Sequence, residues 1–184
     1  MPSHNPHNPD LAALIRLFDD CFYTTYNTRL IKGVDEPIYL PAGSECSYHQ
    51  IVFAHGFFSS ALHEIAHWCI AGERRRQQID FGYWYEPDGR TVEQQHLFES
   101  VEVKPQALEW IFSKSSGKKF RISVDNLNGE TTDAKPFKRS VYRQVITYCE
   151  EGLSERAERF RQALVKYFDT PKSLLPEDYV LDEI

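Results

Sequence analysis

The stretch ALHEIAHWC, from Ala61 to Cys69, carries two histidines four residues apart, with a glutamate directly after the first. Its apolar residues recur at the spacing of a helix, at Leu62, Ile65, Ala66, Cys69 and Ile70. Because residues i and i+4 share one face of a helix, His63 and His67 can both offer a ring nitrogen to one metal ion. At about 100° per residue, they lie at one flank of the apolar stripe, where ligands on the floor of a cleft would lie.

The rest of the sequence predicts a mixture of helices and short strands. A first helix is expected at Leu11–Phe22, and two more between Phe137 and Phe168, separated near Gly152. The helix that carries the two histidines is expected to be capped by Ser59 or Ser60 and to run to about Ala71, where Gly72 ends it. Another is expected from about Thr91 to Ser113, with a kink or restart at Pro105. β-Forming residues dominate 36–43, 48–56, 77–90 and 118–129. Since helices and strands do not alternate regularly, we expect an α+β fold with a short mixed sheet packed against several helices and the HExxH motif on a central helix.

The composition is that of a globular protein. The chain has 184 residues, of which 41% are hydrophobic and 14% aromatic, enough for one domain with a sizeable core. We expect a single domain over residues 11–184, after a polar, proline-rich and frayed N-terminus over residues 1–10. The four cysteines are far apart and form no CxxC pair, which indicates reduced thiols rather than a zinc knuckle or a disulfide framework.

Charge and hydropathy exclude some partners. The net charge of -6 argues against nucleic-acid binding driven by overall charge, so no direct nucleic-acid partner is expected. No apolar run approaches the roughly 18 residues of a membrane span. The N-terminus does not have the pattern of a signal peptide, so we expect a cytoplasmic protein with no membrane partner.

A third metal ligand is expected from the helix that follows, TVEQQHLFESVEVKPQALEWIF (91–112). Its apolar stripe consists of Phe98, Val101, Leu108 and Phe112. On a helical wheel, Glu102 lies about 90° from the centre of this stripe, whereas Glu99 and His96 lie about 150° away and are expected to face solvent. Glu102 is therefore the candidate that can look inward.

The set His63, His67 and Glu102 has more than one chemical meaning. With zinc it would be a hydrolase site, in which Glu64 acts as the general base on a metal-bound water. With Fe(II) it would be a two-histidine, one-carboxylate site that leaves positions open for oxygen and a co-substrate or substrate. A metal of purely structural role would need a fourth ligand, for which His55 is a candidate. From the ligand types alone a hydrolase is favoured, because HExxH is commoner there; the metzincin extension is absent.

Longer segments add a resemblance to a known family. They are NTRLIKGVDEPIYLPAG (27–43), IVFAHGFFSSALHEIAHWCIAGERRR (51–76), DFGYWYEPDGR (80–90) and FESVEVKPQALEW (98–110). These segments closely resemble the bacterial elongation factor P hydroxylase family, from about residue 22 to 126 and more loosely to about 168. The resemblance implies a cytosolic non-haem Fe(II) enzyme that uses O2 to hydroxylate the β-lysyl-modified lysine of elongation factor P. It also implies an α+β fold, unlike the usual oxygenase barrel and closer to a metal-dependent ribonuclease.

The family's metal motif is two histidines and one carboxylate. His63 and His67 match it directly, and the carboxylate maps to Glu102, with Glu99 one turn earlier as the reserve. Glu64 would then orient a ligand or water, or hydrogen-bond to a metal ligand. The resemblance leaves zinc-dependent hydrolysis as the alternative function.

Two further clusters could serve a cationic protein side chain or a partner protein. Tyr83, Trp84 and Tyr85, beside Glu86 and Asp88, would suit an ammonium group, although alternating aromatic residues in a strand more often pack in a core. The run Arg74–Arg76 could steer an acidic protein surface, or could simply complement the dipole at a helix end.

Overall fold

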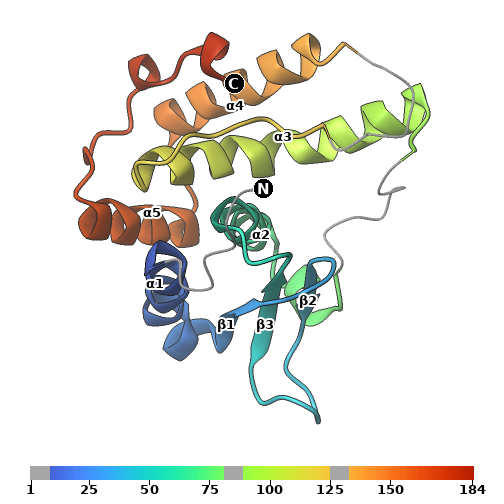
Figure 1. Ribbon diagram of the computed structural model, residues 1–184, viewed down its shortest axis with the longest axis vertical. Coiled ribbons are helices and arrows are strands. Elements are labelled where there is room, and N and C mark those ends of the chain that lie inside the picture. Colours follow the sequence, from blue (N-terminus) through green and yellow to red (C-terminus); the bar gives the residue numbers. More distant parts are fainter. Residues whose placement is uncertain (1–8, 81–88, 125–132) are drawn as a thin grey trace, which may run out of the picture.

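The computed structural model describes residues 9–80, 89–124 and 133–184. A small sheet lies at one end of the molecule, and the helices are stacked on it in successive layers (Figure 1). The helices are α1 (Pro9–Tyr26), α2 (Phe58–Ile70), α3 (Val92–Ser115), α4 (Lys135–Glu151) and α5 (Glu155–Phe168), and the strands are β1 (Thr28–Lys32), β2 (Ile38–Leu40) and β3 (His49–Phe53). Short 3-10 turns follow at Arg75–Gln77, Pro176–Asp178 and Leu181–Glu183. The predicted α+β class is confirmed.

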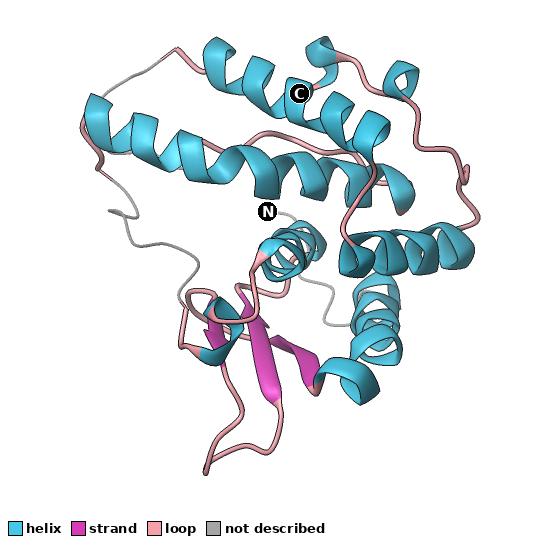
Figure 2. Cartoon of the chain, turned by 180° about the vertical axis from the view of Figure 1, so that it is seen from behind, coloured by secondary structure: helices cyan, strands magenta, loops and turns pink. Residues whose placement is uncertain are grey.

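The sheet is mixed, with the strand order β1-β3-β2 (Figure 2). β1 pairs with β3 in parallel, so that Leu30 lies opposite Ile51, and β2 pairs with β3 in the antiparallel sense, so that Tyr39 also lies opposite Ile51. On the free edge of β2, the Tyr39 and Asp80 backbones exchange two hydrogen bonds. The chain leaving α2 therefore returns to the sheet and brings residues 71–80 beside the HExxH helix.

The first core joins α1, α2 and α5 to the sheet, and its centre is aromatic. Phe18 and Phe22 of α1 pack against Trp68 of α2, with ring centroids 5.3 Å and 4.8 Å apart, and Phe160 of α5 closes the cluster at 5.9 Å from Phe18. Arg156 of α5 donates to the Cys69 and Ala71 carbonyls at 3.0 Å and 2.6 Å. These contacts hold the C-terminal end of α2 in one place.

A second core lies between α3 and α4. Trp110 stacks on Phe120 at 5.7 Å and meets the edge of Tyr179 at 5.3 Å, while Val141 and Val145 of α4 are fully buried beside them. α3 separates the two cores and serves both, because Leu108 and Phe112 face the first and Trp110 faces the second. None of the helices in the described residues is long and apolar enough to cross a membrane.

Helix α3 does not restart at Pro105, one of the two outcomes expected there. A capping box starts it, in which the Thr91 side chain accepts from the Gln94 backbone and the Gln94 side chain accepts from the Thr91 backbone. Pro105 then stands inside a single 24-residue helix. One missing backbone hydrogen bond is outweighed by the packing of α3 on both sides. The predicted serine cap of α2 is also wrong, since its N-cap is Phe57 and makes no side-chain cap.

The strand predicted within 118–129 is wrong for the described residues 118–124, which adopt no regular structure. This segment runs alongside α3 (Figure 1), where buried amide side chains take the place of a partner strand. Gln106 accepts from Ser123 N at 3.0 Å and donates to Ser123 O at 2.8 Å. Gln95 donates to Val124 O at 3.2 Å.

The aromatic cluster around Phe160 makes a prediction for stability. Phe160 is fully buried, so Phe160→Ala should lower the free energy of unfolding by about 3–5 kcal/mol through lost burial and a residual cavity. On the same helix, Tyr167 is 50% exposed, and Tyr167→Ala should cost less than about 1 kcal/mol. Urea unfolding followed by circular dichroism measures both; equal losses would contradict the packing described.

Candidate metal centre

Three side chains from α2 and α3 meet between these two helices. His63 Nε2 and His67 Nε2, on successive turns of α2, are 3.1 Å apart. The Glu102 carboxylate of α3 straddles them, with Oε1 3.2 Å from His67 Nε2 and Oε2 3.5 Å from His63 Nε2. One ligand atom from each residue lies within 4.8 Å of the others. The structure thus brings together the three residues that the sequence singled out.

This donor set fits a transition-metal ion. Nitrogen and oxygen ligands that bind one ion at about 2.0–2.2 Å lie about 3.0–3.5 Å from one another, which the observed separations match. Glu102 is only 2% exposed, and a buried carboxylate needs a compensating positive charge. Three protein ligands leave coordination positions for other molecules. His55, the candidate fourth ligand, is not part of this group in the described residues.

Two further residues of α3 hold the ligands in position. Glu109 accepts a hydrogen bond from His63 Nδ1 at 2.8 Å, which directs Nε2 of the same ring toward Glu102. Gln106 lies one turn after Glu102, with its Nε2 3.5 Å from Glu102 Oε2, and its amide is itself anchored to Ser123. Glu102, Gln106 and Glu109 therefore form one polar face of an otherwise apolar helix segment.

The carboxylates on α3 control the charge of His63. Burial by itself lowers the pKa of His63, but the charges of Glu102 and Glu109 outweigh burial and raise the pKa to about 10. At neutral pH this imidazole is therefore protonated and donates from both nitrogens. Burial raises the pKa of the neighbouring Glu64, although His63 and His67 act in the opposite direction.

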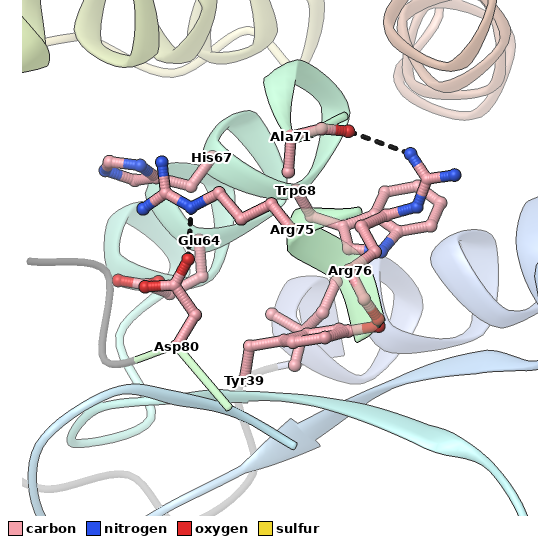
Figure 3. A pocket seen from close by; sticks show the side chains of 9 residues that line it. Tyr39, Glu64, His67, Trp68, Ala71, Arg75, Arg76 and Asp80 are labelled. Carbon is pink, nitrogen blue, oxygen red and sulfur yellow. Dashed lines mark hydrogen bonds and ion pairs between the residues drawn. The ribbon is translucent and has the colours of Figure 1, made fainter. Parts of the chain in front are cut away.

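A pocket opens beside the three-residue cluster, on the side of His67 and Glu64 (Figure 3). It is small and partly open to solvent, and its walls are Tyr39, Ile51, Glu64, His67, Trp68, Ala71, Arg75, Arg76 and Asp80. Burial raises the pKa of Tyr39 to about 12, so this wall is a neutral phenol. The pocket therefore leads from solvent to His67, one of the three clustered residues.

Other predicted residues fall outside the cluster. His96 is exposed as expected, but Glu99 is buried rather than solvent-facing, and Gln95, which also donates to the Val124 carbonyl, donates to it. Glu99 bonds to Gln95 at 3.2 Å and is not among the three grouped ligands. The aromatic and acidic residues 83–88 lie outside the described residues.

The arginine run is engaged locally. Arg75 forms an ion pair with Asp80, and Arg76 donates to the Ala71 carbonyl at 2.8 Å while lying over Trp68 (Figure 3). Arg76 thus complements the C-terminal end of α2, as one of the two interpretations of this run expected.

Glu109 is the site residue that the sequence reasoning missed. It follows Glu102 by seven residues, two helical turns, and so shares its face. This seven-residue spacing from Glu102 is the feature of the sequence that indicates Glu109 as a site residue.

Proton release should accompany metal binding. Because His63 is protonated at any pH well below about 10, a metal ion must displace a proton from it, and the apparent metal affinity should rise with pH by up to about ten-fold per unit. Competition titrations with a metal-sensitive dye at several pH values measure this slope. An affinity that does not depend on pH would contradict a protonated His63.

Glu109 should support the metal indirectly. Glu109→Gln keeps the size of the side chain but removes the charge that orients His63, so the metal affinity should fall about 10–100-fold. Glu99→Gln is the matched control, since Glu99 is another buried carboxylate of α3, outside the cluster, and should change the affinity much less. If Glu99→Gln had the larger effect, the carboxylate ligand would have to be reassigned.

The chain is similar to known proteins over most of its length. Residues 17–179 match the family model described as elongation factor P hydroxylase. The elongation factor P lysine hydroxylase of Haemophilus influenzae (strain ATCC 51907 / DSM 11121 / KW20 / Rd) is 59% identical over 160 residues, which cover 87% of this chain and 90% of the relative. The chain therefore belongs to the elongation factor P hydroxylase family.

Proposed function

We propose that this protein hydroxylates the β-lysyl-modified lysine of elongation factor P, with Fe(II) held by His63, His67 and Glu102 and with O2 as the oxidant. The observation that carries the proposal is the two-histidine, one-carboxylate cluster in a member of this family. The relative from Haemophilus influenzae is named for action on a lysine of the same factor. A cytoplasmic protein substrate agrees with the localisation expected from the sequence.

The ligand set supports iron chemistry of this kind. A bound Fe(II) ion with open positions would supply the oxygen activation that insertion into a C–H bond requires. One oxygen atom enters the C–H bond, and the other leaves as water with two electrons and two protons from a reductant. The protein side chains hold the ligands in position and admit the substrate.

Each residue around the cluster has a distinct task in this proposal. Glu109 holds the His63 ring so that Nε2 faces the ion. Gln106 ties Glu102 to the backbone of Ser123, which limits the movement of the buried carboxylate. The pocket beside His67 admits the substrate side chain next to the ion and shields part of it from water.

Zinc-dependent hydrolysis is the alternative that the same ligands permit. There Glu64, directly after His63, would act as general base on a metal-bound water. The two functions differ in their need for oxygen, so a chelator-sensitive cleavage of peptide or RNA that proceeds without O2 would favour the hydrolase.

The proposed reaction should change the mass of elongation factor P. The purified protein with Fe(II), a reductant and air should add the mass of one oxygen atom to the β-lysylated factor, and isotopically heavy O2 should label the product. Glu102→Gln should reduce the product to background, because a neutral amide replaces a buried anionic ligand. Intact-mass spectrometry measures both reactions.

Two controls make this test decisive. Glu93→Gln changes an exposed carboxylate in the first turn of the same helix and should leave turnover unchanged. Addition of the same mass in the strict absence of O2, or label derived from water rather than from O2, would refute oxygen as the oxidant.

A further inference from the structure

Glu64 differs from the other charged residues that line the pocket beside His67. Arg75 pairs with Asp80, Arg76 bonds to the Ala71 carbonyl, and His67 contacts Glu102. Glu64, by contrast, makes no hydrogen bond or ion pair with any other residue in the described ranges 9–80, 89–124 and 133–184. Among the described carboxylates that line the pocket, Glu64 is therefore the one available to bind a ligand.

The position of Glu64 links the pocket to the metal cluster. It follows His63 on α2 and shares the pocket wall with His67, one of the three clustered residues. Glu64 is partly buried, and a carboxylate withdrawn from bulk water favours a cationic partner. A molecule that entered the pocket and reached Glu64 would lie next to the cluster.

The remaining walls suit an aliphatic chain. Ile51, Trp68 and Ala71 present apolar surface, and Tyr39 presents a neutral ring. Figure 3 shows Tyr39, Trp68 and Glu64 around the same space. The two cations in the wall are already engaged, Arg75 with Asp80 and Arg76 with Ala71 and Trp68. A pocket with apolar wall residues, and with a carboxylate that no described residue pairs with, matches an alkylammonium group.

We propose that Glu64 is the ion-pair partner of an ammonium group on the lysine-derived substrate side chain, whose methylenes lie between Tyr39, Ile51 and Trp68. This inference rests on the proposed function and assigns the substrate subsite of the same centre. Glu64 is then a specificity-determining residue that recognises positive charge, rather than the general base that HExxH indicates in a hydrolase. Its carboxylate needs no proton transfer in this role.

The test is a binding cycle with two forms of elongation factor P. One form carries the β-lysyl group on the target lysine, and the other carries an acetyl group there, which keeps the lysine methylenes and the amide but has no ammonium. Dissociation constants for metal-loaded wild-type protein and Glu64→Gln are measured by calorimetry without oxygen, so that no turnover occurs.

Glu64→Gln should weaken binding of the β-lysylated form at least about ten-fold and leave binding of the acetylated form nearly unchanged. Glu64→Asp, which retains the charge, should preserve the discrimination between the two forms. Glu73→Gln is the matched control, because Glu73 is an exposed carboxylate just after α2, and it should alter neither constant. If Glu64→Gln does not fold, as judged by thermal unfolding, Glu64→Ser is put through the same cycle under the same criterion.

Two results would overturn the inference. Equal effects of Glu64→Gln on both forms would show that Glu64 does not sense the ammonium. Unchanged binding of both forms to Glu64→Gln would show that Glu64 forms no ion pair with the substrate. Either result leaves the proposed function standing if the wild-type protein still hydroxylates the β-lysylated factor, whereas absence of that reaction refutes the proposed function itself.

Discussion

The burial of the Glu102 carboxylate between two helices is the constraint on which the centre depends. A carboxylate that is almost fully withdrawn from water must be compensated by positive charge and hydrogen bonds. α2 supplies two imidazoles on successive turns, and on α3 Gln106 lies beside the carboxylate while Glu109 bonds to the His63 ring. The two helices can therefore pack at this place only in the register that brings these polar groups together.

The rest of the fold serves to keep that register. The aromatic cluster of α1, α2 and α5 fixes one side of α2, and Arg156 bonds to the carbonyls at its C-terminal end. α3 is held between two separate cores, so it cannot slide along α2 without disturbing both. The segment 118–124 closes over the polar face of α3 and supplies backbone partners for its buried amides.

The sequence predicted the features that depend on local periodicity. The 3.6-residue repeat predicted that His63 and His67 share one face of a helix, and the helical wheel of the next helix predicted that Glu102 faces inward. It placed Glu99 toward solvent, wrongly, since Glu99 is buried and bonds to Gln95, which also donates to the Val124 carbonyl of a later segment. The strand expected at 118–124 failed for a related reason: its β-forming residues lie against helical side chains and have no partner strand among the described residues. Contacts between distant segments decided each of these cases.

The division of the ligands between two helices has a thermodynamic consequence. His67 and Glu102 are 35 positions apart, so they can hold one ion together only when α2 and α3 are docked. An ion that binds the folded chain and not the unfolded one stabilises it by about 2.7 kcal/mol at a hundred times its dissociation constant. The supply of metal would then govern how long each molecule survives proteolysis, and a shortage of the ion would reduce the amount of protein along with its chemistry.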